Sequence, residues 1–160
     1  MLYNFLLEFI EIFSFLNVFK YITFRTGLAV FTSLLTVLII GGPFIKMVSD
    51  KKIINPIRDD GPGDHIVKKI GTPTMGGLVI LIGIILSVFM WSDIKNVYII
   101  FLLYILVSFG LLGFLDDFKK IKNNNSSGVS FKFKLFTQII LSIIGISFLT
   151  YYLDYQQLKY

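Results

Sequence analysis

The sequence predicts an all-α fold, namely a polytopic membrane protein with four transmembrane helices preceded by an interfacial N-terminal helix. Of the 160 residues, 55% are hydrophobic and only 16% are charged, whereas about a quarter of the residues of a typical soluble domain are charged. The charges are clustered, which leaves four uncharged stretches of 19 to 23 residues. Each stretch is long enough to cross a hydrocarbon core of about 30 Å as a helix.

Residues 1–22 are predicted to form the interfacial helix rather than a span. Glu8, Glu11 and Lys20 interrupt this segment, and no basic residue precedes its apolar part, as a signal peptide would require. Its apolar residues recur at helical spacing: Leu2, Phe5, Leu6 and Phe9. This pattern is typical of an amphipathic helix that lies in the membrane surface.

The rest of the chain is predicted to be one membrane domain with the following layout. The spans cover about 24–45, 72–92, 96–115 and 135–153, and the loops cover 46–71 and 116–134. Eleven of the fifteen Lys and Arg residues lie within 46–70 and 116–134, so the positive-inside rule predicts that both loops are cytoplasmic and both termini are outside. This bias also explains the net charge of +5, and no nucleic-acid binding is predicted.

Composition excludes several kinds of site. The chain has no cysteine, which rules out disulfides and thiolate metal sites. Apart from Arg25 at the edge of the first span, no predicted span contains a charged residue, which argues against an ion pathway or a proton relay through these helices. The only histidine, His65, lies in a loop, where a lone histidine is more often solvated than catalytic. Chemistry on polar substrates is therefore expected in the two loops.

The first candidate site is the stretch "GTPTMGG" at 71–77, which follows Lys68 and Lys69. Thr72 before Pro73 is a favourable helix start, and free amides at a helix start attract anions. Thr74 adds a hydroxyl group. The stretch is thus interpreted as a phosphate-binding site, with a plainly capped helix start and topology-setting lysines as the alternative.

The second candidate site is "GFLDDFKKIK" at 113–122. Asp116 and Asp117 are expected at the C-terminal end of the third span, where the negative end of the helix dipole disfavours acids. Lys119, Lys120 and Lys122 could compensate for these charges, and so could a divalent cation. Because Mg²⁺ is usually bound by one or two carboxylates together with phosphates and water, the two sites together suggest a reaction on phosphates at the bilayer surface.

Four stretches together resemble one enzyme family: "NVFKYITFRTG" at 17–27, "RDDGPGDHIVKKIGTPTMGG" at 58–77, "GFLDDFKKI" at 113–121 and "GVSFKFKLFTQ" at 128–138. They are similar to the N-terminal part of phospho-N-acetylmuramoyl-pentapeptide transferase, a polyprenyl-phosphate sugar-1-phosphate transferase. The resemblance implies transfer of phospho-MurNAc-pentapeptide from UDP to undecaprenyl phosphate, which gives lipid I and UMP for peptidoglycan. It also implies Mg²⁺ as cofactor. The protein is expected to be a multi-pass protein of the bacterial cytoplasmic (inner) membrane, with its active face on the cytoplasmic side. A homodimer is a possible assembly.

The resemblance also assigns roles to residues. Asp116 and Asp117 match the essential acid pair and metal ligands, with Asp116 expected as proton acceptor or orienter and Asp117 as metal ligand. The substrate-binding residues are Lys69, Thr74, Lys120 and Lys134. Members of this family are longer and carry a third aspartate downstream, so the 160-residue chain alone is expected to be inactive. Two alternatives stay open: a related sugar-1-phosphate transferase, and a non-catalytic membrane fragment that associates with partner helices.

Overall fold

The computed structural model describes residues 2–9, 12–50, 75–123 and 128–157, and within these ranges all regular structure is helical. The elements in chain order are α1 (Leu2–Glu8), the 3₁₀ helix η1 (Ser14–Lys20), α2 (Ile22–Asp50), α4 (Gly76–Trp91), α5 (Val97–Asn123) and α6 (Phe131–Gln157). The predicted all-α class is confirmed.

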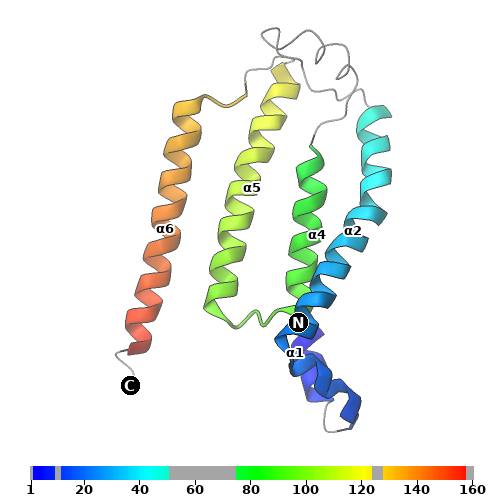
Figure 1. Ribbon diagram of the computed structural model, residues 1–160. Coiled ribbons are helices and arrows are strands. Elements are labelled where there is room, and N and C mark those ends of the chain that lie inside the picture. Colours follow the sequence, from blue (N-terminus) through cyan, green and yellow to red (C-terminus); the bar gives the residue numbers. More distant parts are fainter. Residues whose placement is uncertain (1, 10–11, 51–74, 124–127, 158–160) are drawn as a thin grey trace.

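The four long helices stand in an open row and run alternately in opposite directions (Figure 1). Helix α2 packs against α4, α4 against α5, and α5 against α6, while α1 contacts both η1 and α4. Within the described ranges α6 packs only against α5, so the four helices do not close into a bundle. Consecutive helices are therefore neighbours, and the ends formed by Asp50, Gly76, Asn123 and Phe131 lie at the same end of the row.

Three helices are long and apolar enough to cross a membrane, namely α2, α5 and the part of α6 from Phe131 to Asp154. Helix α4 is apolar but has 16 residues, which corresponds to about 24 Å at 1.5 Å per residue, against a hydrocarbon core of about 30 Å. Three of the four predicted spans are thus supported by helices of sufficient length. Whether the second span crosses the bilayer stays a prediction.

The distribution of apolar side chains fits hydrocarbon surroundings. Among the described residues only four apolar side chains are buried: Leu16, Val48, Val79 and Leu112. By contrast Leu38, Ile39 and Leu102 are more than 60% exposed. Apolar surfaces this extensive are not stable in water but are suited to lipid or to partner helices. The chain is therefore a membrane protein, as its composition predicts.

The N-terminal segment differs from the prediction. Instead of one helix over residues 1–22, there are two short pieces, α1 and η1, and α2 begins at Ile22. In η1 the Asn17 side chain donates a hydrogen bond to the Ser14 carbonyl oxygen at 3.1 Å. This bond between residues three apart fits the 3₁₀ geometry of η1. The interfacial position of this segment stays a prediction.

The helix ends also differ from the predicted span ends. Helix α5 continues to Asn123 and α6 begins at Phe131, so most of the loop expected at 116–134 is helical. The helix continues beyond the apolar stretch because Lys120 and Lys122, in its last turn, stabilise the negative end of the helix dipole. Helix α4 begins at Gly76, later than predicted, and Met75 precedes it with φ 68°. Met75 is therefore the N-cap residue of α4, the position that was predicted for Thr72. Thr72 itself lies outside the described residues.

A glycine lies at the crossing of α2 and α4. A Cβ atom added at Gly83 of α4 would lie 3.0 Å from Val37 Cγ2 and 3.1 Å from the Ser33 carbonyl oxygen, both on α2. A larger residue would push the two helices apart, whereas glycine lets their backbones approach. This contact fixes α4 against α2 and leaves the opposite side of α4 to face α5.

Candidate active site

The two adjacent aspartates lie inside α5 and not at its end. Asp116 and Asp117 are followed by nearly two more turns of helix up to Asn123. The dipole of a helix acts mainly on its last turn, so the expectation that it disfavours these acids is wrong. Their charges are compensated by neighbouring side chains instead.

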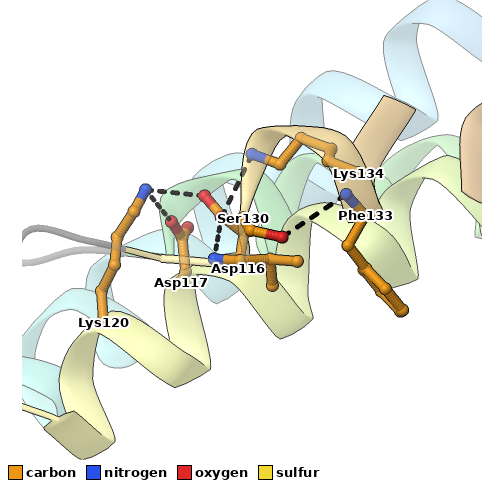
Figure 2. A network of polar contacts seen from close by, with 7 residues as sticks. Asp116, Asp117, Lys120, Ser130, Phe133 and Lys134 are labelled. Carbon is orange, nitrogen blue, oxygen red and sulfur yellow. Dashed lines mark hydrogen bonds and ion pairs between the residues drawn. The ribbon is translucent and has the colours of Figure 1, made fainter. Parts of the chain in front are cut away.

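Asp116 accepts contacts from three donors at once (Figure 2). Lys120 Nζ lies 2.7 Å from Asp116 Oδ2 and Lys134 Nζ lies 3.1 Å from Oδ1. The Val129 backbone amide donates to Oδ1 at 2.8 Å. Since the Asp116 side chain is only 10% exposed, and buried charges need paired donors, these contacts explain how the carboxylate is tolerated. Asp116 thereby joins α5 to the start of α6.

Asp117 is in a different environment. Its side chain is 35% exposed, and Lys120 Nζ lies 3.5 Å from its Oδ1 atom. Within the described ranges no hydrogen bond or ion pair is recorded at its other oxygen. The two neighbouring acids therefore differ: Asp116 has donors on both oxygens, whereas Asp117 keeps an oxygen available to a ligand.

The segment 128–130 also belongs to this network, and the sequence did not predict its contact with Asp116. A Cβ atom added at Gly128 would lie 2.8 Å from the Asp116 carboxyl carbon and 2.9 Å from Lys120 Cε, so only glycine lets the backbone approach the acid this closely. The Ser130 hydroxyl accepts a weak hydrogen bond from the Phe133 amide at 3.4 Å, at the first turn of α6, where Lys134 lies. In the sequence, Gly128 of "GVSF" is the residue that could have indicated this close approach.

A groove connects the acid pair with the start of α4. Its volume is about 370 Å³, and Asp116, Asp117 and Phe114 of α5 line it together with Met75 and Gly77. A Cβ atom at Gly77 would meet nothing within 4 Å, so this glycine opens the groove rather than packing against a helix. The structure thus brings the second predicted site beside the end of the first.

Four of the six predicted site residues are close together: Asp116, Asp117, Lys120 and Lys134. The other two, Lys69 and Thr74, lie outside the described residues, as does His65. Thr74 directly precedes Met75 in the chain, and Met75 lines the groove.

The charges of this site bear on metal binding. The two aspartates and two lysines sum to zero formal charge, so these four side chains alone do not attract an anionic phosphate. Within the described residues no group of three or more acids or histidines could hold a metal ion. Mg²⁺, however, needs only one or two protein carboxylates when phosphates and water complete its shell. Asp117 fits that requirement through its available oxygen, whereas Asp116, already paired with two ammonium groups, does not.

Comparisons with known proteins match a signature that includes the start of α4 and also nearly the whole chain. Residues 69–81 match the phospho-N-acetylmuramoyl-pentapeptide-transferase signature 1. A phospho-N-acetylmuramoyl-pentapeptide-transferase of Pelagibacter ubique (strain HTCC1062) is 61% identical over 150 residues, which is 94% of this chain and 42% of the relative. Proteins of the same name from Thermodesulfovibrio yellowstonii and Borrelia turicatae are 44% and 42% identical, over 89% and 87% of this chain and 39% and 40% of their own length.

The chain spans about two fifths of the length of the curated relatives that it matches. The identity extends over nearly the whole chain and includes the signature that begins at Lys69. The resemblance recognised in the sequence is therefore confirmed: the chain is related over most of its length to the phospho-N-acetylmuramoyl-pentapeptide-transferases.

Proposed function

We propose that this chain forms part of the active site of an enzyme that transfers phospho-MurNAc-pentapeptide from UDP to undecaprenyl phosphate, with lipid I and UMP as products of this step in peptidoglycan synthesis. The observation that carries the proposal is the groove that joins the acid pair of α5 to the start of α4, next to the matched signature. Catalysis of phosphoryl transfer consists mostly of positioning and of charge stabilisation, and both can be assigned to residues of this groove.

In this proposal Asp116 is a positioning residue. Both of its oxygens already accept contacts from Lys120, Lys134 and the Val129 amide. A carboxylate paired in this way is a poor proton acceptor, so the orienting role is favoured over the role of base. Asp116 lines the groove and holds the ammonium groups of Lys120 and Lys134 beside it. In this proposal those N–H donors stabilise negative charge on the phosphates of the substrate.

Asp117 is proposed to bind Mg²⁺. The zero net charge of the four-residue network supports this assignment, because a diphosphate needs added positive charge in order to bind there. When bound, Mg²⁺ would neutralise charge on the phosphate oxygens. Lys69 and Thr74 are proposed to hold the UDP part of the substrate; they precede Met75 in the sequence, and Met75 lines the groove.

The site is proposed to lie at the cytoplasmic face of the bacterial inner membrane. The support is the excess of Lys and Arg in the sequence segments 46–70 and 116–134. Because the chain has no cysteine, single cysteines at Asn55 and Asn124 can report topology. Impermeant thiol reagents should label them only after the membrane is opened, and labelling in intact cells would contradict this orientation.

The activity test uses the intact protein that carries this chain. UMP release is measured with UDP-MurNAc-pentapeptide and undecaprenyl phosphate over a series of Mg²⁺ concentrations, with a UDP-sugar that lacks the peptide as the comparison substrate. Asp117→Asn should lower turnover by at least about 10²-fold, because a bound metal ion supplies several kcal/mol of transition-state stabilisation, and higher Mg²⁺ should restore part of it. Near-normal turnover of Asp117→Asn would contradict the proposal, and equal turnover of both substrates would favour a related sugar-1-phosphate transferase.

The 160-residue chain on its own is proposed to have little turnover. Asp117 is the one acid of the described network with an available oxygen, and the row of helices is open beyond α6. Purified chain should release no UMP above background under conditions in which the intact protein is active. Sustained release would show that these helices suffice for catalysis.

A further inference from the structure

A second polar cavity lies at the end of the row opposite the acid pair. It has a volume of about 360 Å³ and is formed by the start of α2, the end of α4 and the link to α5. Figure 1 shows these ends next to α1. The polar residues that line the cavity are Arg25, Thr26, Trp91, Ser92, Asp93 and Asn96.

Two buried donors of this cavity lack a partner among the residues that the structure describes. Arg25 Nε and Trp91 Nε1 are shielded from solvent, and neither has a hydrogen-bond acceptor within the described part of the chain. Leaving a buried donor without an acceptor is unfavourable, and nearly all such groups in proteins are paired. Two unpaired donors that line one cavity therefore point to an acceptor supplied by a ligand.

Both side chains are held in place by aromatic contacts. The Arg25 guanidinium lies 3.9 Å from the centroid of the Tyr3 ring. The Trp91 ring is stacked on Phe19, with centroids 5.8 Å apart and an angle of 2° between the planes. Since neither side chain depends on the cavity for its position, the donors are preorganised for a ligand.

The depth of the cavity in the membrane indicates the class of ligand. Arg25 directly precedes the uncharged stretch 26–45, and Trp91 lies at the end of the uncharged stretch 70–92. Tryptophan is enriched at this boundary, beside the lipid head groups. The ligand that is always present at this depth and carries negatively charged oxygen acceptors is a phospholipid.

We propose that this cavity binds the phosphodiester group of a membrane phospholipid, with Arg25 Nε and Trp91 Nε1 as donors to its oxygens. Hydrogen bonds from a guanidinium to phosphate are among the stronger ones in proteins. Asp93 also lines the cavity, and its carboxylate repels a doubly charged free phosphate more than a singly charged diester. The site is separate from the groove at the acid pair and does not depend on transferase activity.

The first test needs no variant. The intact protein, purified in detergent, is titrated with short-chain phosphatidylglycerol, phosphatidylethanolamine or diacylglycerol, and bound lipid is counted by native mass spectrometry. Both phospholipids should bind at least about tenfold more tightly than diacylglycerol, which lacks the phosphodiester, because one charge-assisted hydrogen bond is worth a tenfold change or more. Equal binding of diacylglycerol would overturn the proposal. Displacement of the lipid by inorganic phosphate at comparable concentration would assign the site to free phosphate instead.

Two conservative variants locate the site. Trp91→Phe keeps a ring for stacking on Phe19 but removes the N–H donor, and Arg25→Lys keeps the positive charge but removes the buried Nε donor. Each should weaken phospholipid binding about tenfold, while Lys20→Ala should not, because Lys20 is exposed and does not line the cavity. Helical content and unfolding temperature are checked for each variant. Unchanged lipid binding in both folded variants would refute the assignment.

Discussion

Replacing Asp116 by Asn should destabilise the protein much more than replacing Asp117 by Asn. The two residues are adjacent in the sequence, so they share helix propensity and distance from the end of α5. They differ in their contacts: Asp116 is 10% exposed and paired with two lysines, whereas Asp117 is 35% exposed and, among the described residues, has one contact at 3.5 Å. If the pair merely ended a helix, both changes would stabilise slightly.

The magnitude follows from the contacts that are lost. Each of the two lysine contacts of Asp116 is a charge-assisted bond worth about 1.5–3 kcal/mol when buried. Lys120 and Lys134 are 24% and 36% exposed, so water recovers part of the loss, and we expect a net cost of about 2–3 kcal/mol. Asp117→Asn loses one partly exposed pair, which is worth at most about 1 kcal/mol.

The assay is thermal unfolding of the intact protein in one detergent, at one pH and one salt concentration. The temperature shift per kcal/mol falls with protein length, and the relatives are more than twice as long as this chain, so about 1–2 °C correspond to 1 kcal/mol. Asp116→Asn should therefore lower the unfolding temperature by about 2–6 °C, and Asp117→Asn by less than about 2 °C. The reasoning is refuted if the two variants unfold at the same temperature, or if Asp116→Asn is the more stable one.

Two further predictions concern the substrate pocket and the loop. Lys69→Ala should raise the dissociation constant of the UDP-linked substrate about 10- to 150-fold, the equivalent of one charge-assisted contact, while Lys68→Ala should do much less; equal effects in a binding titration would indicate only diffuse attraction. Gly128→Ala should destabilise by about 1–2 kcal/mol, because the added Cβ atom would lie 2.8 Å from the Asp116 carboxyl carbon and would force the Val129 amide away. The control is Gly27→Ala, whose Cβ atom would meet nothing within 4 Å and which lies inside α2, where alanine should be neutral or slightly stabilising. A Gly128→Ala protein as stable as this control in thermal unfolding would contradict the proposed close approach.

The features that depend on short-range information were predictable from the sequence. The lengths of the uncharged stretches predicted helices, and α2, α5 and α6 are long and apolar enough to span a membrane. The motifs "GTPTMGG" and "GFLDDFKKI" identified the family, which the signature at 69–81 and the relatives support. Helix ends were predicted less well, since polar residues that follow a span can continue the helix, as they do in α5 up to Asn123.

The sequence by itself determined that this chain is an α-helical membrane protein and that two acids and nearby lysines are candidates for phosphate chemistry. It did so because the length of an apolar stretch and the residue types of a motif are properties of the chain alone. Only the tertiary structure decided that Asp116 is paired with Lys120 and Lys134 while Asp117 keeps an available oxygen. That difference depends on where the start of α6 lies relative to α5. Residue spacing within one helix cannot predict that Lys134 of α6 contacts Asp116 of α5, because this contact is set by the packing of the two helices. The same holds for Arg25 and Trp91, which are far apart in the chain and line one cavity only because α2 packs against α4.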